Sequence, residues 1–529
     1  MNRRKRQKQL EAGFGKIPHV SYYDGDMEYI RTYHDFRREK GLDPFLIDEI
    51  TWNDLDMDRL YRRINPGLST SGEQYLYHML RSPATDRETW ETRKRWIDLM
   101  EAEPELRLRL QMILAGLGRT RRADLCSAFY PREHSRRWLW IYLLHGAAFL
   151  VLLVLAAILQ SMGLLIVGLL LAGWNSMLHE YRKHRCQWDY DIVNTTVTMV
   201  FGLQKIRRMG HGTLDPLLAD SYRHLDRLRS VLRIGGVSMV RDGGLGELVA
   251  TVLFLDLIAF EFLKNKLGDC HEDVFAVHET LGQIDAAIAV ASFRKSLGRY
   301  AVPELDFTAE KPCIRIDGMV HPLLSKAVPN DLHTYGPILI TGSNASGKST
   351  YLKTAVISML LAQSICTVTA ESCRASVFRM YSSMALSDDL LAGESYYIVE
   401  TRSLKRILDA LDSCPPVLCA IDEVLRGTNT VERIAASSTI LEEIADRGGM
   451  CLAATHDIEL CGLLEDRYGL YHFEEQVGLT EMLFDYRIRQ GKAVSRNAIN
   501  LLKLMGFEQS IVEEAHLRAS GYMENGVWK

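Results

Sequence analysis

The chain has 529 residues, of which 47% are hydrophobic and 25% charged, which excludes a mainly disordered protein and predicts about three domains. Its 63 basic and 67 acidic residues give a net charge of −4, so the whole chain lacks the basic excess of a dedicated nucleic-acid-binding protein, although a local basic surface is compatible with it. Ten cysteines without a C-x-x-C pair argue against a disulfide framework and a zinc ribbon, and they suit a reducing compartment.

The N-terminus, MNRRKRQKQ, carries five basic residues among its first eight and lacks the apolar core of a signal peptide. We interpret residues 1–49 as a solvated, frayed basic tail followed by a short helical segment. Contact of the tail with phosphates, either of nucleic acid or of an anionic membrane face, is the alternative.

One segment of the chain is unusually apolar, because residues 138–179 contain no Asp, Glu, Lys or Arg. The sequence QSMG at residues 160–163 divides it into two runs. The first, 138–159, is long enough to cross a bilayer, and the second, 164–178, is short but can borrow Met162, Gly163 and His179. Basic residues flank both outer ends and the connecting turn is uncharged, so the positive-inside rule keeps both ends in the cytoplasm. We predict a transmembrane hairpin with basic flanks over residues 131–185. A hairpin buried in a large helical core is the alternative, but soluble core helices rarely stay charge-free on every face for this long.

The remaining chain divides into a helical part and a part with strands. Apolar and charged residues alternate at helical spacing over residues 20–130 and 186–300. The second region contains a strong apolar helix at 246–267 and an amphipathic one at 271–297. Glycines between residues 235 and 246 predict a break or hinge. From about residue 301, short apolar runs alternate with helical stretches, which indicates βαβ units and a sheet covered on both faces.

Residues 341–350, TGSNASGKST, complete the G-x4-GK[ST] pattern between a short buried strand and an expected helix. Glycines let successive backbone N–H groups point at phosphate oxygens at the positive end of that helix. Lys348 would reach the β- and γ-phosphates of ATP, and the hydroxyl of Ser349 would bind Mg²⁺. The predicted nucleotide-binding residues of this loop are Gly342, Ser343, Asn344, Ala345, Ser346, Gly347, Lys348, Ser349 and Thr350.

Two further apolar strands end in polar side chains. The run VLCAIDE at 417–423 is expected to lie beside the phosphate-loop strand, with Asp422 holding Mg²⁺ through water and Glu423 positioning or deprotonating the attacking water. The run MCLAATH ends in His456, which at the carboxyl end of a strand could touch the γ-phosphate or that water. An ordinary strand end and a structural histidine are the alternatives. Together the three motifs predict an enzyme that hydrolyses ATP with Mg²⁺.

These motifs and the residues between them resemble the MutS family of ATPases, the DNA mismatch-repair clamps. The similar blocks are residues 321–332, 341–353, 370–390, 422–430 (DEVLRGTNT), 454–460 (ATHDIEL) and 484–514. Less specifically, residues 51–83 and 286–323 resemble the start of the family's helical core and its return into the ATPase domain. The resemblance implies an α/β P-loop NTPase domain of the ABC/MutS type over residues 301–529, with a C-terminal helical region. It also implies that residues 50–130 and 186–300 form an all-α core or lever region, which here carries the transmembrane helical hairpin.

The family also implies a dimer in which each nucleotide lies between one subunit's phosphate loop and a serine of the other subunit. Ser395, in the sequence Gly-Glu-Ser, matches that serine, and Asn429 would lie at the same interface; a solvated loop serine is the alternative for Ser395. Tyr486 falls where the family often places an adenine-stacking ring, and a core tyrosine is the alternative. The implied catalytic residues are Glu423, His456, Lys348 and Ser395.

The chain also departs from the family pattern. About 50 residues precede the core-like segment, too few for the mismatch-sensing domain, and neither its aromatic-x-Glu wedge nor a C-terminal nuclease domain is evident. Ala327 and Val328 replace the aromatic residue that often precedes the phosphate-loop strand. We therefore expect a membrane-containing bacterial branch of the family that lacks the mismatch-recognition domain.

The expected protein is a dimeric MutS-like ATPase tethered to the cell membrane, multi-pass, with its ATPase domain in the cytoplasm. It would bind double-stranded DNA through phosphate contacts without reading mismatched bases. The alternative is a membrane-bound mechanochemical ATPase that acts on a protein or lipid partner without DNA. An ABC transporter subunit is disfavoured, because the sequence has no LSGGQ-like signature.

Overall fold

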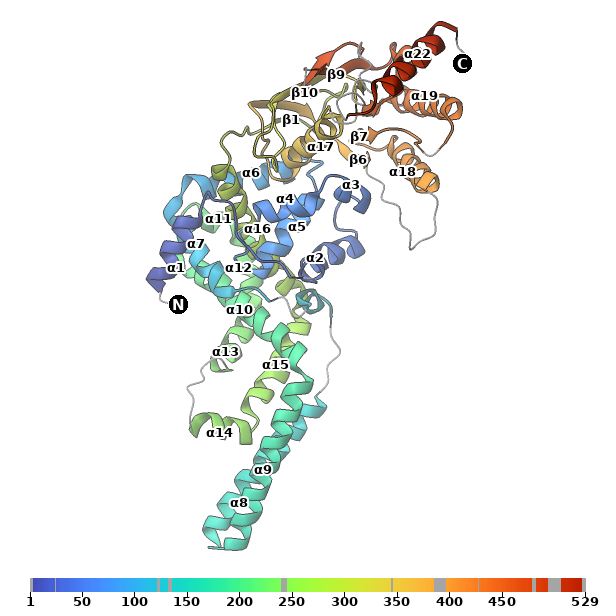
Figure 1. The fold of residues 1–529 in the computed structure, drawn as a ribbon. Helices are drawn as coiled ribbons and strands as arrows, with labels where there is room; N and C mark the ends of the chain where they lie inside the picture. The colour runs from blue at the N-terminus through green and yellow to red at the C-terminus, as the bar shows by residue number, and fades with distance from the viewer. Residues whose placement is uncertain are drawn as a thin grey trace. The chain divides into compact units, whose positions relative to one another are not determined.

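The computed structural model describes residues 3–23, 25–120, 124–131, 136–238, 245–343, 346–384, 396–426, 428–477, 482–492 and 506–525 (Figure 1). The chain divides into two compact units, which are described separately below. The first unit comprises Met1–Leu42, Ile64–His78 and Trp96–Ser292, and the second comprises Asp43–Arg63, Met79–Arg95 and Phe293–Lys529.

The first unit is helical throughout the residues that the structure describes. Its elements are α1 (Arg3–Gly13), α2 (Asp26–Lys40), α5 (Thr70–Arg81), α6 (Arg87–Ala102), α7 (Pro104–Leu117), the 3₁₀ turn η1 (Leu125–Phe129), α8 (Arg137–Ile158), α9 (Met162–Arg185), α10 (Gln187–Met209), α11 (Leu214–Leu217), α12 (Ala219–Arg227), α13 (Arg229–Ser238), α14 (Leu245–Val252), α15 (Leu255–Asp269) and α16 (His271–Ser296), with α5, α6 and α16 continuing into the second unit. The expected helical character of residues 50–130 and 186–300 is therefore confirmed. The basic N-terminal segment is solvated, since α1 buries no side chain, but it forms a helix and the expected frayed tail is wrong.

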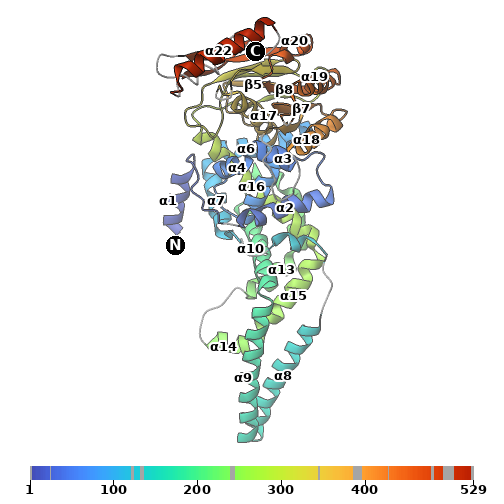
Figure 2. The same cartoon turned by 45° about the vertical axis from the view of Figure 1, so that its right-hand side comes forward.

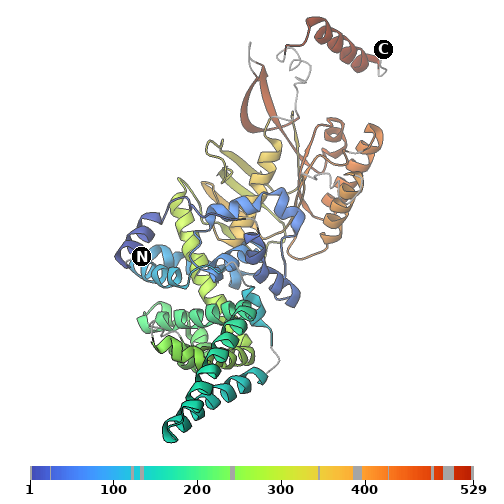
Figure 3. The ribbon, with the colours of Figure 1, turned by 60° about the horizontal axis from the view of Figure 1, so that its bottom comes forward.

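Helices α8 and α9 lie side by side and extend past the other helices of their unit (Figures 1, 2 and 3). By length and composition both are candidate membrane spans, and only 17% of the apolar window of each is buried within the protein. Helix α16 also meets the composition criterion, but 78% of its window is buried, as expected for a core helix.

The expected single apolar helix over residues 246–267 is wrong. The structure divides it into α14 and α15 at Leu253 and Phe254, and Phe254 adopts a left-handed backbone with φ 56°. Apolar residues continue without interruption across this point, so the sequence pattern did not indicate the break. The expected hinge between 235 and 246 falls largely in residues 239–244, outside the described residues.

The second unit contains two sheets. The four-stranded sheet has the order β1-β5-β2-β3, and the six-stranded sheet has the order β10-β9-β4-β8-β7-β6. Their strands are β1 (Glu304–Asp306), β2 (Ile314–Met319), β3 (Asn330–Thr334), β4 (Ile338–Thr341), β5 (Ser372–Ser376), β6 (Arg379–Ser383), β7 (Val417–Asp422), β8 (Met450–Thr455), β9 (Gly469–Val477) and β10 (Met482–Gln490). The helices that belong chiefly to this unit are α3 (Glu49–Asp54), α4 (Met57–Ile64), α17 (Lys348–Ser364), α18 (Tyr396–Ala410), α19 (Thr430–Asp446), α20 (Glu459–Leu464) and α22 (Gln509–Asn525).

In the six-stranded sheet β6, β7, β8, β4 and β9 are parallel, and β10 pairs antiparallel with β9. Strand β8 lies between β4 and β7, so the expectation that the Asp-Glu strand directly neighbours the phosphate-loop strand is wrong. The carboxyl ends of β4, β8 and β7 nevertheless meet at one edge, where open α/β sheets collect their ligands.

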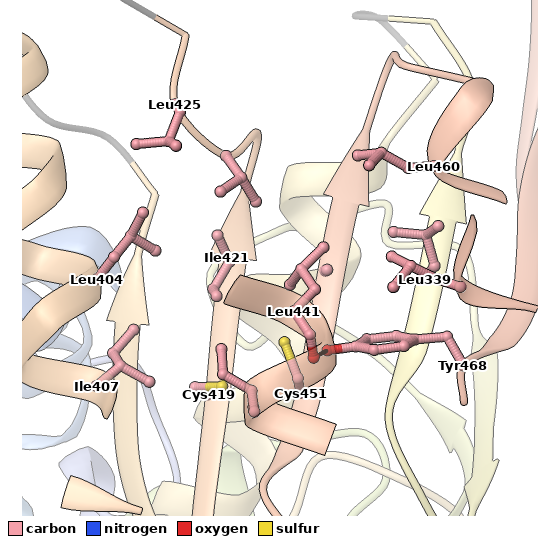
Figure 4. Packing of buried hydrophobic residues seen from close by; sticks show 14 of the residues in the cluster. Leu339, Leu404, Ile407, Cys419, Ile421, Leu425, Leu441, Cys451, Leu460 and Tyr468 are labelled. Atoms are coloured by element: carbon pink, nitrogen blue, oxygen red, sulfur yellow. Dashed lines mark hydrogen bonds between the residues drawn. The ribbon is translucent and has the colours of Figure 1, made fainter. Parts of the chain in front are cut away.

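Both faces of this sheet are covered. Helices α18, α19 and α20 supply leucines and isoleucines to a cluster that contains Cys419 and Cys451 of the strands (Figure 4). Tyr468 reaches across this cluster and donates from its hydroxyl to the Leu441 carbonyl oxygen at 2.8 Å. Helix α17 packs against β7 and β8, and every residue of β4, β7 and β8 is buried. Continuous apolar strands are the pattern that a doubly covered parallel sheet requires.

Candidate active site at the carboxyl edge of the parallel strands

The loop after β4 folds around the first residue of α17. Lys348 is only 3% exposed, and its Nζ donates to the carbonyl oxygens of Gly342 and Ser343, both at 2.6 Å. The Ser346 hydroxyl donates to the same Ser343 oxygen at 2.8 Å. The ammonium group is thereby held at the N-terminus of a 17-residue helix, where free N–H groups and the helix dipole favour an anion.

Two glycines of the loop cannot be replaced without strain. Gly342 and Gly347 have φ angles of 142° and 104°, a region that other residues rarely adopt. A Cβ on Gly342 would lie 3.1 Å from the Phe473 carbonyl oxygen, and a Cβ on Gly347 would lie 3.2 Å from the Tyr486 ring. The glycine spacing therefore reflects both backbone conformation and space.

Glu423 and His456 meet at the ends of β7 and β8. Glu423 Oε1 lies 2.9 Å from His456 Nε2, and Glu423 Oε2 lies 2.6 Å from Arg426 Nε. His456 Nε2 is also 3.3 Å from Lys348 Nζ. One nitrogen cannot donate to a carboxylate and accept from an ammonium at once, so we assign the proton of Nε2 to the Glu423 contact. The structure thus brings three of the four predicted catalytic residues together.

The backbone and the charge of Glu423 are both constrained. Its φ is 60°, and its N–H donates to the Ala454 carbonyl oxygen of β8 at 2.9 Å, which aims the side chain across the sheet edge. Burial alone would raise the pKa of this carboxyl, but the hydrogen bond from His456 and the charges of Arg426 and Lys348 outweigh burial and hold it below its ordinary value. Glu423 is therefore ionised near neutral pH, as a general base must be.

The oxygen ligands at this edge fit Mg²⁺. Ser349 is exposed at the first turn of α17, and Asp422 is the buried last residue of β7. Among the residues that the structure describes, no group of three or more His, Cys, Asp or Glu could hold a metal by itself. Mg²⁺ in phosphate-transfer sites is typically bound by one or two protein oxygens together with substrate phosphates and water, which agrees with this donor set.

A cavity of about 370 Å³ opens beside the loop and is lined by residues from Gly347 to Tyr351, together with Phe473 and Tyr486. Its volume lies in the usual range for small-molecule sites. Tyr486 is 46% exposed, which is not the burial of a core tyrosine. Ala327 and Val328 also line the cavity, at the place where the family often has an aromatic residue.

Tyr486 is held by an irregularity in β10 that the sequence did not predict. The register of the β9–β10 pair shifts between Phe484 and Ile488, and Tyr486 has a φ of 53°. Asn330 bridges this bulge, because its Nδ2 donates to the Tyr486 carbonyl oxygen and its Oδ1 accepts from the Ile488 N–H, both at 2.9 Å. Asn330 lies inside the block that resembles the family, so its sequence context was the available signal.

Two more residues near the site were not predicted. Arg426 pairs with Glu423 and follows it by three positions within DEVLRGTNT. Glu400 of α18 is only 3% exposed. Its Oε1 accepts a hydrogen bond from the Arg426 N–H at 3.3 Å. Burial raises the pKa of Glu400, opposed by the backbone N–H groups of Arg426 and Leu425. No local pattern could have linked α18 to this loop.

Of the remaining predicted site residues, three lie outside the described part of the chain and two lie within it. Asn344, Ala345 and Ser395 lie outside the described residues. Asn429 caps α19, accepting from the Glu432 N–H through Oδ1 at 3.0 Å. Thr350 is exposed in the first turn of α17 and lines the cavity.

Comparison with known proteins relates this site to one family. Residues 338–521 match the family described as MutS domain V. The chain is 28% identical over 284 residues to the DNA mismatch repair protein MSH3 of Phaeosphaeria nodorum, covering 50% of this chain and 25% of that protein. It is 31% identical over 281 residues to the DNA mismatch repair protein MutS of Natronomonas pharaonis and 31% identical over 277 residues to that of Carboxydothermus hydrogenoformans. These two matches cover 50% and 49% of this chain, and 32% and 33% of the relatives.

The C-terminal part of the chain is thus similar to MutS-family proteins, and its expected α/β ATPase-type fold is confirmed. The chain spans a quarter to a third of the length of these relatives.

Proposed function

We propose that this MutS-like chain is an ATPase that works as a dimer, is anchored in the cell membrane, and grips duplex DNA without reading mismatched bases. The observation that carries the ATPase assignment is the convergence of Lys348, His456 and Glu423 at one sheet edge beside a ligand-sized cavity. The match to MutS domain V independently supports it.

The residues of the site have separable tasks in this proposal. Lys348 and the N–H groups at the start of α17 bind the phosphate chain of ATP. Ser349 and Asp422 would hold Mg²⁺, which neutralises phosphate charge. Glu423 orients and deprotonates the attacking water, and His456 fixes the Glu423 carboxylate by donating to it.

The cavity has room for the base of ATP, with Tyr486 at its rim as a stacking surface. Tyrosine offers a π-face that accepts a purine without a hydrogen-bond code. The contact of Tyr486 with Gly347 keeps that ring close to the phosphate loop.

Dimerisation and DNA binding come to this chain from the family resemblance. Ser395 would approach the γ-phosphate of the other subunit's ATP, with Asn429 near the same interface. ATP would then close the two ATPase domains, and its hydrolysis would release them. The DNA contacts we propose are phosphate contacts, which position a protein on a duplex without reading its base sequence.

The anchor is the α8–α9 hairpin, with both ends of the hairpin and the ATPase domain on the cytoplasmic side. The apolar windows of both helices are mostly exposed, and the basic flanks agree with that orientation. Carbonate washing of membranes tests the anchor: the full chain should stay with the membrane fraction, and a variant lacking residues 138–179 should leave it.

The DNA proposal is tested by titrating duplex DNA into the purified full-length protein in lipid vesicles and measuring ATP turnover at low salt. We expect turnover to rise with DNA, and the half-saturating DNA concentration to increase steeply with salt because phosphate binding releases counterions. The Lys348→Ala variant is the control for contaminating ATPases.

ATP turnover that responds to no duplex, single-stranded or branched DNA would contradict the DNA assignment. The protein would then fit the second candidate, a membrane-bound mechanochemical ATPase with a protein or lipid partner. The near-balanced charge of the chain is the observation that favours that candidate.

A further inference from the structure

Helix α14 and the start of α15 pack on the α8–α9 hairpin (Figures 1 and 2). The ring of Phe254, at the break between α14 and α15, stacks on Tyr142 of α8 at 5.1 Å between ring centres. The Leu253 backbone runs along Gly146, where an added Cβ would touch the Leu253 carbonyl oxygen at 3.4 Å. The break is therefore part of the hairpin's own packing surface.

A backbone carbonyl at the break is partnered by a side chain of the hairpin. Asn175 of α9 is fully buried, and its Nδ2 donates to the Val252 carbonyl oxygen at 3.1 Å. Its Oδ1 lies 3.1 Å from Nδ1 of His145 on α8. Such pairing is required where no water reaches the backbone, since an unpartnered carbonyl in hydrocarbon costs several kcal/mol.

The one acidic side chain at the start of α15 is also neutralised internally. Asp256 pairs with His179 of α9, with Nε2 lying 2.9 Å and 3.0 Å from the two carboxylate oxygens. Both side chains are almost completely buried. An unpaired carboxylate would not be tolerated in an apolar layer, whereas a paired one is.

The opposite side of the segment is largely apolar and exposed, and Glu247 in the first turn of α14 is exposed as well. Three large hydrophobic side chains of this segment are uncovered within the protein: Leu248, Val249 and Leu255. The exposed apolar surface is continuous with that of the hairpin, because α14 packs directly on α9.

Further charged side chains of α15 follow one to three turns after Asp256, at Glu261 and Lys264. Arg182 of α9 donates to the Tyr142 hydroxyl at 3.0 Å and lies 3.9 Å from Glu261, while its guanidinium covers the Trp138 ring at 3.7 Å. Lys264 pairs with Asp189 in the next turn. Aromatic and charged side chains at one level are typical of a membrane–water interface.

We propose that residues 245–260 form a re-entrant segment, which enters the cytoplasmic leaflet beside the hairpin and leaves it again at Glu261. The occupant of its exposed apolar face is the acyl-chain layer of the bilayer that holds the hairpin. This inference rests on the proposed membrane anchor and adds a third embedded piece to it.

The test measures the rate at which a membrane-impermeant maleimide modifies single introduced cysteines in the full chain, in membrane vesicles with the cytoplasmic side outward. The variants are Leu248→Cys and Val249→Cys in α14, Leu144→Cys in the hairpin, and Leu517→Cys in α22. Leu517 is the matched control for Leu248, because their exposed fractions are 68% and 63%. Modification is followed by peptide mass, so native cysteines do not interfere, and ATP turnover verifies folding.

We expect the α14 cysteines to react about 10-fold more slowly than Leu517→Cys and the exposed native Cys414, and about as slowly as Leu144→Cys, because maleimide needs a thiolate in water. If maleimide modifies the α14 cysteines fast while Leu144→Cys is protected, the re-entrant segment is refuted and the proposed anchor is not. Fast reaction at all of these positions would instead contradict the membrane anchor.

A second measurement separates lipid from protein contact. A nitroxide attached at Leu248→Cys before reconstitution should collide often with oxygen, which concentrates in acyl chains, and rarely with a water-soluble nickel chelate. Rare collisions with both reagents would mean that another protein surface, such as a second copy of the chain, covers α14, and would overturn the lipid assignment.

Discussion

Two of the histidine–carboxylate pairs among the described residues have the same closest distance and different surroundings. His456 and Glu423 meet at 2.9 Å at the sheet edge, and His179 and Asp256 meet at 2.9 Å at the base of the hairpin. The first pair has side chains 34% and 22% exposed, and Lys348 and Arg426 adjoin it. The second has side chains 3% and 5% exposed.

The comparison shows that function follows from what surrounds a pair rather than from the pair itself. Around Glu423, cations outweigh burial and keep the carboxylate ionised beside a cavity, which suits chemistry on a substrate. Around Asp256, both members of the pair are almost completely buried, and the contact with His179 helps to make the buried carboxylate tolerable, which suits a structural role.

The largest effect is expected from Lys348→Ala. It removes the ammonium group from the helix N-terminus, so phosphate binding loses its main charge, and ATP turnover should fall at least about 100-fold. Steady-state phosphate release checks this. Lys353→Ala, on the same helix but paired with Asp56, is the matched control and should keep nearly normal turnover. Wild-type turnover in Lys348→Ala would refute the assignment of the phosphate loop.

His179→Ala should destabilise the helical unit and leave the chemistry alone. It removes the His179 partner of the buried Asp256 carboxylate, and breaking a buried pair typically costs about 3–5 kcal/mol. Thermal unfolding in detergent checks this, with the exposed His184→Ala as control. The double variant His179→Ala with Asp256→Leu should recover part of the loss, and no difference between the single and double variants would remove the pairing argument.

The stability of the protein should depend on pH through Asp285, a buried acid for which no cationic partner is found among the described residues. Burial raises the pKa of Asp285 to about 7, reinforced by Glu73 and opposed by the hydrogen bond from Ser69. The folded state therefore holds a proton that the unfolded state releases near pH 4. Between pH 4 and 7 this group lowers the free energy of unfolding by about 1.4 kcal/mol for each unit that the pH rises, with no further loss above pH 7.

Denaturant titrations of wild type and Asp285→Asn across pH 4 to 8 check this prediction. The variant should lose that part of the pH slope, since an amide does not titrate. Parallel slopes in the two proteins would show that Asp285 does not carry the effect.

The smallest effect is expected at the base pocket. Tyr486→Ala should weaken ATP binding by about 1–3 kcal/mol, the usual range for a stacked base, whereas Tyr486→Phe should bind almost normally. Isothermal titration with ATP measures both. Equal affinities for alanine and phenylalanine variants would mean that the ring does not contact the base.

Much of the site could be predicted because its determinants are local in the chain. The loop from Gly342 to Thr350 and the strand ends at Asp422 and His456 each carry their own pattern. Since the carboxyl ends of parallel strands share an edge, the patterns meet whatever the strand order. The order of the strands in the sheet is not encoded in any one segment of the chain, and β8 in fact lies between β4 and β7.

The unpredicted features depend on contacts between distant segments. Asn330 fixes a bulge more than 150 residues later, with sequence separations of 156 and 158 in its two hydrogen bonds. Glu400 reaches the loop after β7 from another helix. The break at Phe254 occurs within an unbroken apolar pattern, because Asn175, 77 residues earlier, partners the Val252 carbonyl.

The most direct test of the central claim is ATP binding and hydrolysis by Glu423→Gln. The amide keeps the shape of the side chain but cannot accept a proton, so we expect normal ATP affinity and a chemical step about 10²- to 10⁴-fold slower in single-turnover assays. With ATP, this variant should also accumulate as a closed dimer. Hydrolysis at the wild-type rate would contradict the role of Glu423, and with it the account of this sheet edge as the catalytic centre.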